Sequence, residues 1–198
     1  SLILLLTLNY LYGSIIIKNY NKRDSKKINS TIKIISPKIE ISRFFDNEKP
    51  SEIIKELIKL SNPNLQKNTI FIFPEGILTS IYVDDLKSYK KLFSDNYSSN
   101  HKIILGINSF ENNKIYNSLV VINKDTKILA KYNKNNLVPF GEFLPLENLL
   151  SKVGVKKIIS GYQSYNADNN RKVLTINKIK FLPLICYEII YSGELNKS

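Results

Sequence analysis

Three places in the sequence combine an ionisable residue with an apolar strand or a structured loop. They are Glu75 after the run TIFIFP, Lys134 and Glu142 within NKNNLVPFGEFLP, and Cys186 with Glu188 after the run FLPLI. A thiol is a weak nucleophile until a neighbouring group takes its proton or favours the thiolate. A glutamate can act as that base, and a lysine can favour the thiolate and stabilise an oxyanion. The pattern therefore predicts acyl transfer through a cysteine, without histidine.

Each of these features alone also has an ordinary explanation. Cys186 is the only cysteine, and free cysteines are often simply buried in cores. A Pro-Glu pair after a strand is usually an exposed turn, and a loop lysine is usually solvated. The single histidine, His101, leaves any Cys–His pair dependent on one residue. One cysteine and one histidine exclude a multi-cysteine or histidine-rich metal site, and the seven glycines form no phosphate loop, so we expect no cofactor.

Apolar patterning predicts the elements that position these residues. Strands are expected at 31–36, 69–73, 102–107, 116–123 and 127–132, with a later hairpin of strands 173–176 and 179–185 turned at 177–178. Helices are expected at 51–60 with Ser51 as N-cap, after Asp84 as cap, and weakly at 147–159, while 133–145 is expected to be an irregular loop. The run 181–190 is interpreted as a buried strand that carries Cys186 at its C-terminal end. Strands alternating with helices indicate the α/β class.

Residues 2–17 carry no charge, which predicts the end of a transmembrane helix although a full span needs about 20 residues. Tyr10, Tyr12 and Tyr20 would suit the membrane interface. A signal-peptide core and a surface strand pair are the competing interpretations. We expect three parts: a membrane helix at 1–17, a basic linker at 18–30, and one catalytic domain at 31–198.

The net charge of +12 suggests an acidic partner such as nucleic acid or an anionic membrane surface. The lysines are spread along the chain instead of forming one stripe, and no nucleic-acid motif is present. We therefore expect no nucleic-acid partner.

The joint pattern resembles the nitrilase superfamily, whose members use a Glu–Lys–Cys triad on a four-layer α-β-β-α sandwich. Within it, the loops are similar to those of bacterial apolipoprotein N-acyltransferases. The matching residues are Pro74-Glu75, Tyr132, Lys134, LVPFGE at 137–142, Pro145 and the CYE motif at 186–188. Residues 106–108 and Tyr116-Asn117-Ser118 resemble that family's strand and its tyrosine–asparagine turn. The resemblance covers about residues 31–195.

This resemblance implies a role for each site residue. Cys186 would take an acyl chain from a phospholipid as a thioester, with Glu75 as general base and Lys134 on the oxyanion. Glu142 would orient the lysine or the incoming amine, and Glu188 would support the site beside the nucleophile. The α-amine of a diacylglyceryl-cysteine on a lipoprotein would then take the acyl chain. Apolar residues near the site would line an acyl path or simply pack in the core: Phe140, Phe143, Leu144, Leu146 and Tyr187.

The chain also departs from the family pattern. Phe73 and Gly76 stand where tryptophan and a small hydroxyl residue are common. The family continues past the CYE motif through further strands and a last membrane helix, so the sandwich is expected to be C-terminally incomplete. The lysines at 18–30 favour the cytoplasmic side, whereas the resemblance implies an inner-membrane protein with a periplasmic catalytic domain, which we prefer. The alternatives are a soluble amidase for small amides and a non-catalytic remnant of the acyltransferase.

Overall fold

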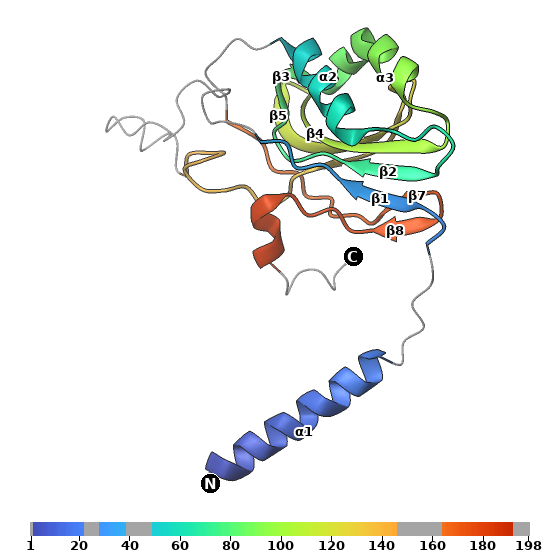
Figure 1. Ribbon diagram of the computed structural model, residues 1–198. Helices are drawn as coiled ribbons and strands as arrows, with labels where there is room; N and C mark the ends of the chain where they lie inside the picture. The colour runs from blue at the N-terminus through green and yellow to red at the C-terminus, as the bar shows by residue number, and fades with distance from the viewer. Residues whose placement is uncertain (1, 22–27, 39–48, 146–163, 192–198) are drawn as a thin grey trace.

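A computed structural model describes residues 2–21, 28–38, 49–145 and 164–191 (Figure 1). The helix predicted at 147–159 and the side chain of Leu146 lie outside these ranges.

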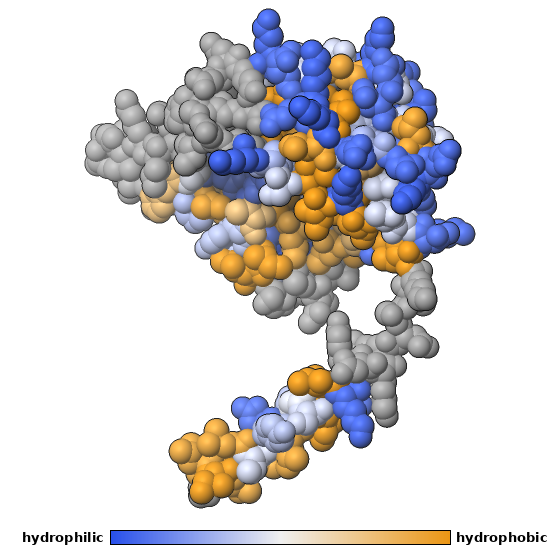
Figure 2. All heavy atoms as spheres, in the orientation of Figure 1, coloured by the Kyte–Doolittle hydropathy of each residue, from blue (hydrophilic) through white to orange (hydrophobic). Residues whose placement is uncertain are grey.

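The first helix, α1 (Leu2–Asn21), stands apart from the rest of the described chain. Its Leu2–Asn19 stretch is long and apolar enough to cross a membrane, and none of it is buried. Figure 2 shows hydrophobic colouring at the free end of this helix and again near its other end, with paler residues between. The helix includes residues 18–21, which the sequence assigned to the linker.

The central element is a six-stranded mixed sheet. Its strands are β1 (Thr31–Ile34), β2 (Thr69–Ile72), β3 (Leu78–Tyr82), β4 (His101–Glu111), β5 (Lys114–Ile122) and β6 (Ile128–Asn133). The order is β1-β2-β4-β5-β6, with β3 paired to the end of β4. The first four strands pair in parallel, whereas β5 and β6 add antiparallel. The predicted 116–123 and 127–132 hairpin is confirmed, while β4 is longer than predicted and β3 was missed.

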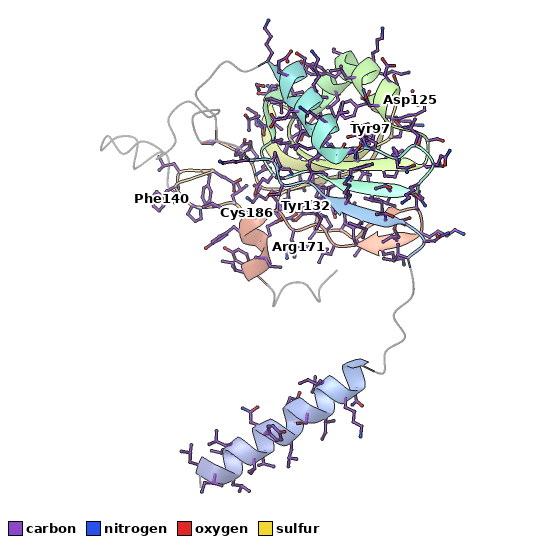
Figure 3. All side chains as sticks on the ribbon, in the orientation of Figure 1. Tyr97, Asp125, Tyr132, Phe140, Arg171 and Cys186 are labelled. Atoms are coloured by element: carbon purple, nitrogen blue, oxygen red, sulfur yellow. The ribbon has the colours of Figure 1, made fainter. Side chains whose placement is uncertain are left out.

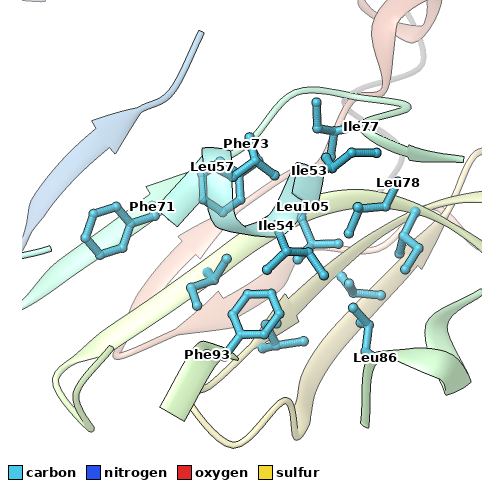
Figure 4. Close-up of a cluster of buried hydrophobic side chains, with 14 of the residues drawn as sticks. Ile53, Ile54, Leu57, Phe71, Phe73, Ile77, Leu78, Leu86, Phe93 and Leu105 are labelled. Atoms are coloured by element: carbon cyan, nitrogen blue, oxygen red, sulfur yellow. The ribbon is translucent and has the colours of Figure 1, made fainter. Parts of the chain in front are cut away.

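Helices cover one face of this sheet: α2 (Pro50–Ser61), the 3₁₀ helix η2 (Val83–Tyr89) and α3 (Lys90–Asn96). Ile54, Leu57 and Phe93 pack there against Phe71 and Leu105 (Figure 4). These side chains follow the helical and strand periodicities that the sequence showed.

The predicted helix caps were wrong. Lys49, not Ser51, is the N-cap of α2, because Pro50 suits the first helical position, where no N–H is needed. Asp84 is not the N-cap of η2, because that position is occupied by Tyr82. Asp85 instead accepts the Tyr82 N–H at 2.8 Å.

The other face of the sheet is covered by a hairpin of β7 (Leu174–Ile176) and β8 (Ile179–Phe181). Its turn is the predicted Asn177-Lys178 pair, both in the left-handed region with φ of 48° and 69°. Ile176 packs against the sheet with Ile70 and Ile104. The described chain thus forms helix, sheet and hairpin layers, the arrangement expected of an α/β sandwich.

The predicted strand through Cys186 was wrong. β8 ends at Phe181, and the following residues are irregular up to η4 (Cys186–Ile190), a 3₁₀ helix. Pro183 explains the early end, because proline has no N–H for a strand ladder. Cys186 therefore begins a helical turn and does not end a strand.

Candidate active site

Glu75 lies just past the C-terminal end of β2, where Pro74 turns the chain out of the sheet. Gly106 on β4 lies directly against this turn. A Cβ atom at Gly106 would come within 2.7 Å of the Glu75 Cα and 3.0 Å of the Pro74 carbonyl oxygen. Only glycine therefore allows the backbone of Glu75 to pack this closely on β4. The Glu75 side chain remains 34% exposed.

Lys134 follows β6 directly and points into the protein, with 1% of its side chain exposed. Its backbone is held on both sides, since its N–H donates to the Asn117 carbonyl at 2.9 Å and its carbonyl accepts from Asp168 N at 3.0 Å. The Nζ atom lies 3.2 Å from Glu75 Oε1 and 3.1 Å from Glu142 Oε1. The structure thus brings together three of the predicted residues.

The charge state of Lys134 follows from this setting. Burial alone would lower the pKa of Lys134, but the charges and hydrogen bonds of Glu75 and Glu142 outweigh it and raise the pKa above its ordinary value. The side chain is therefore a fixed ammonium at neutral pH. A fixed ammonium can stabilise an anion but cannot serve as a base.

Glu142 closes the loop that carries it. Its N–H donates to the Val138 carbonyl at 2.9 Å, and its Oε2 accepts the Val138 N–H at 2.9 Å. Phe140 between them has φ of 63°, which lets the loop turn back on itself. Lys134 Nζ lies 3.1 Å from each oxygen of this carboxylate. The predicted irregular loop at 133–145 is thus a structured support for one carboxylate.

Asn117 is a site residue that the sequence argument missed. Its Nδ2 donates to Glu75 Oε1 at 2.7 Å and to Glu142 Oε1 at 2.8 Å. It therefore fixes both carboxylates that flank Lys134. Asn117 lies inside β5 opposite Asn108, so the expected tyrosine–asparagine turn is wrong. The available signal was the polar pair Asn117-Ser118 in the middle of the strand KIYNSLVVI.

Cys186 is exposed and occupies the first position of η4 (Figure 3). Its φ is 48°, in the left-handed region that non-glycine residues rarely adopt. Such strain persists only where the surroundings hold it, and it is concentrated at functional sites. Here Ile185 and Glu188 hold the turn, because Glu188 N donates to the Ile185 carbonyl at 3.2 Å and Glu188 Oε2 accepts the Ile185 N–H at 2.8 Å.

Glu188 links this turn to the loop of Lys134. Its side chain is fully buried. Its Oε1 accepts from Tyr132 OH at 2.7 Å, Asn135 N at 2.8 Å and Asn136 N at 3.2 Å. Burial and the hydrogen bond to Glu188 raise the pKa of Tyr132, so its hydroxyl remains a neutral donor. Because both oxygens of Glu188 are occupied, its geometry is that of a structural anchor and not of a base.

The residues predicted to line an acyl path are arranged differently from one another. Phe140 is 43% exposed, whereas Leu144 is buried. Phe143 is half-buried, and its carbonyl accepts the Phe140 N–H at 2.8 Å. Tyr187 is half-buried and its ring lies edge-on to Tyr191, with 5.6 Å between centroids. Phe140 and Tyr187 therefore have surface open to a ligand, while Leu144 packs in the core.

His101 is not placed to assist Cys186. It is fully buried at the start of β4, and the Glu75 turn packs on Gly106, further along the same strand. Its Nδ1 accepts the Ser98 N–H at 3.1 Å, and its Nε2 bonds to the Asn64 carbonyl at 2.9 Å. Among the residues that the structure describes, no group of His, Cys, Asp and Glu could hold a metal ion.

Comparison with known proteins identifies the family. The carbon–nitrogen hydrolase family matches residues 44–196, which is most of the chain. The chain belongs to the carbon–nitrogen hydrolase family. It is 30% identical over 176 residues to an apolipoprotein N-acyltransferase of Rhizobium leguminosarum bv. trifolii, covering 83% of this chain and 33% of that protein. It is 28% identical over 185 residues to the enzyme of that name from Wigglesworthia glossinidia brevipalpis, covering 91% and 37%.

This carbon–nitrogen hydrolase chain thus spans about a third of the length of these relatives. Among solved structures it is similar to Saccharomyces cerevisiae Nit3, a member of branch 10 of the nitrilase superfamily. That match has 17% identity and a TM-score of 0.47, and covers 86% of this chain and 61% of Nit3. A glutamine-dependent NAD⁺ synthetase from Acinetobacter baumannii matches at 19% identity with a TM-score of 0.46, covering 74% and 26%.

Proposed function

We propose that this protein transfers a fatty acyl chain from a phospholipid to the N-terminal amine of a diacylglyceryl-cysteine lipoprotein, through a thioester on Cys186. The observation that carries the proposal is the buried Lys134 ammonium between Glu75 and Glu142, in a loop that Glu188 ties to the Cys186 turn. The similarity to proteins named apolipoprotein N-acyltransferase supports this acceptor over other amines.

In the first half-reaction, Glu75 takes the thiol proton of Cys186 as the sulfur attacks the ester carbonyl of the phospholipid. The tetrahedral intermediate carries an oxyanion, and the fixed charge of Lys134 stabilises it. The carbon–oxygen bond to the glycerol then breaks, and the proton on Glu75 passes to the leaving alkoxide. The products are a lysophospholipid and the acyl thioester of Cys186.

In the second half-reaction, the neutral α-amine of the lipoprotein attacks the thioester carbonyl. Glu75 takes the amine proton, the carbon–sulfur bond breaks, and the proton returns to the departing Cys186 thiolate. The result is an amide on the lipoprotein and a free thiol. Glu142 has its second oxygen bound to Val138 N, so its role is to hold Lys134 in place.

We propose that α1 anchors this catalytic domain to the bacterial inner membrane, with the domain on the periplasmic side. Support comes from the length and apolar composition of α1, whose Leu2–Asn19 stretch has no buried residue. An exposed apolar helix of this kind loses unfavourable contact with water when it enters a bilayer. A phospholipid donor then lies within the same membrane as the enzyme.

A transfer assay tests the function. The purified full chain is mixed with phospholipid vesicles that carry a labelled acyl chain, and with a synthetic diacylglyceryl-cysteine peptide. The proposal predicts a mass gain of one acyl group on the peptide amine, absent with Cys186→Ala. Release of ammonia from small amides, with no acylated peptide, would instead indicate an amidase, which the family name also accommodates. A folded protein with neither activity would indicate a non-catalytic remnant.

A further inference from the structure

Arg171 lies between two groups that the site depends on, although it reaches neither Lys134 nor Cys186. It precedes β7 and has 11% of its side chain exposed. Its Nη2 donates to Asn136 Oδ1 and lies 3.7 Å from Glu188 Oε1. Within the described ranges, its Nη1 is buried and has no hydrogen-bond partner. This guanidinium is therefore held in place by its contacts on one side only.

The charge of Arg171 compensates a buried carboxylate. Glu188 is fully buried, and its four hydrogen-bond donors are neutral: one tyrosine hydroxyl and three backbone N–H groups. Neutral donors reduce the cost of burying a carboxylate but do not cancel its charge. In the described part of the chain, Arg171 is the cation that lies within ion-pair distance of Glu188.

Arg171 and Glu188 both contact the loop that follows Lys134. Glu188 joins Ile185, next to the nucleophile, to Asn135 and Asn136, which follow Lys134. Arg171 binds the side chain of Asn136 as well as the carboxylate. Its loss would therefore loosen the attachment between the Lys134 loop and the Cys186 turn at two points.

We propose that Arg171 is a positioning residue that, through Glu188 and Asn136, sets where Lys134 lies relative to Cys186. The inference rests on the proposed function for its consequence, since misplacing an oxyanion-stabilising group slows acyl transfer. The effect is on the rate of thioester formation more than on phospholipid binding, because Arg171 acts on the catalytic groups.

The test compares charge removal with charge retention. Arg171→Gln removes the charge and keeps an amide donor on a shorter side chain, while Arg171→Lys keeps a cation near Glu188. Lys172→Gln is the matched control, because it removes one charge from the neighbouring exposed position. Each full-length variant is measured for kcat and KM of thioester formation, for thermal unfolding, and for the rate of iodoacetamide alkylation, which reports Cys186 alone because it is the only cysteine.

The inference predicts that Arg171→Gln lowers kcat by about ten- to a hundredfold with little change in KM, as expected for a small misplacement of a catalytic group. Arg171→Lys recovers most of that loss, and Lys172→Gln behaves like wild type. Wild-type rates in Arg171→Gln would overturn the inference, as would equal losses in the glutamine and lysine variants. If Arg171→Gln does not fold, Asn136→Ala must slow the same step, and an unchanged rate there overturns the inference.

The two proposals fail in distinguishable ways. A wild-type protein that forms no thioester refutes the proposed acyl transfer. The alkylation rate of Cys186 can still test the role of Arg171 in that case. Lys134→Met serves as the reference, because it shows how the alkylation rate changes when the lysine charge is missing. Arg171→Gln must then shift the alkylation rate in the same direction as Lys134→Met, and the wild-type rate would refute the positioning role.

Discussion

The Nζ atom of Lys134 lies 3.2 Å from Oε1 of Glu75, although the two residues are 59 positions apart in the chain. Lys134 is almost fully buried at this point, while Glu75 keeps about a third of its surface in solvent. The pair therefore joins a fixed buried charge to a carboxylate that solvent and substrate can still reach. This division suits one group that stabilises an anion and another that moves a proton.

Replacement of Lys134 by methionine removes the charge and keeps an unbranched side chain that is one atom shorter. We expect acyl transfer to fall by about a thousandfold or more. The substitution removes the group that stabilises the oxyanion, and it also removes a hydrogen bond that holds the Glu75 carboxylate in place. Glu75 and Glu142 also lose the cation between them, and we expect the free energy of unfolding to fall by roughly 2–3 kcal/mol. This loss is smaller than that for breaking a fully buried ion pair, because solvent reaches Glu75. Steady-state transfer and urea denaturation measure the two effects. Lys127→Met, on the exposed turn before β6, should change neither.

The pH dependence follows from the raised pKa of Lys134. A lysine whose pKa is higher in the folded state contributes its stability fully below the unfolded pKa, about 10.4, and loses it as the pH rises through the folded value. The stability difference between wild type and Lys134→Met should therefore stay constant from pH 7 to 9 and shrink only in more alkaline solution. A difference that already shrinks between pH 7 and 9 would show that Lys134 is not the fixed ammonium described above.

Asn117 offers a test of a residue whose role is geometric. Asn117→Ala removes both hydrogen bonds that align Glu75 and Glu142, and we expect a loss of about 1–2 kcal/mol in unfolding free energy and a larger proportional loss in kcat. Asn117→Asp places a third carboxylate beside the other two and should be worse than alanine. The exposed Asn170→Ala serves as control. Transfer rates equal to wild type in Asn117→Ala would refute the alignment role.

Substitution of Gly106 by alanine adds one methyl group and tests whether the close packing of the Glu75 turn on β4 matters. The Cβ of Gly106→Ala would meet the Glu75 backbone at 2.7 Å, so the Glu75 turn must move. We expect kcat to fall on the order of a hundredfold from this displacement, with a stability loss of about 1–3 kcal/mol. Gly13→Ala in α1 is the matched control, because its Cβ meets nothing within 4 Å. Normal activity in Gly106→Ala would mean that the position of Glu75 is not critical.

Glu188→Gln tests the anchor between the two loops. A glutamine has one oxygen, so its amide nitrogen must face either the Ile185 N–H or the three donors at the other oxygen. A buried donor facing a donor costs about 1–3 kcal/mol. We expect a lower midpoint of thermal unfolding and a slower formation of the thioester. An unchanged midpoint would indicate that Glu188 is not the anchor that its contacts suggest.

Much of the site could be predicted from the sequence because its residues follow apolar runs or lie in a distinctive loop. Glu75, Lys134 and Glu142 were singled out in this way, and the structure places Lys134 Nζ 3.2 Å from Glu75 and 3.1 Å from Glu142. Asn117 was missed because a polar residue within a strand does not reveal which side chains it will contact in the folded protein. Its partners come from residues 42 and 25 positions away, which only the sheet brings together.

The elements were predicted less evenly, for identifiable reasons. The long strands follow β-branched runs, and the Asn177-Lys178 turn begins with asparagine, which tolerates positive φ. The apolar run before Cys186 suggested a continuous strand, but Pro183 interrupts the ladder and the chain turns into η4. Apolar runs of this length cannot distinguish a strand from buried irregular chain.

The central claim is that Cys186 carries the acyl chain, and the intact mass of the protein tests it most directly. The full chain is purified with phospholipid and without acceptor peptide, beside Cys186→Ala. We predict one fatty-acyl mass increment on the wild type, absent in the alanine variant and released by hydroxylamine, as a thioester requires. An unmodified mass from a well-folded wild-type sample, as shown by cooperative thermal unfolding, would contradict the claim.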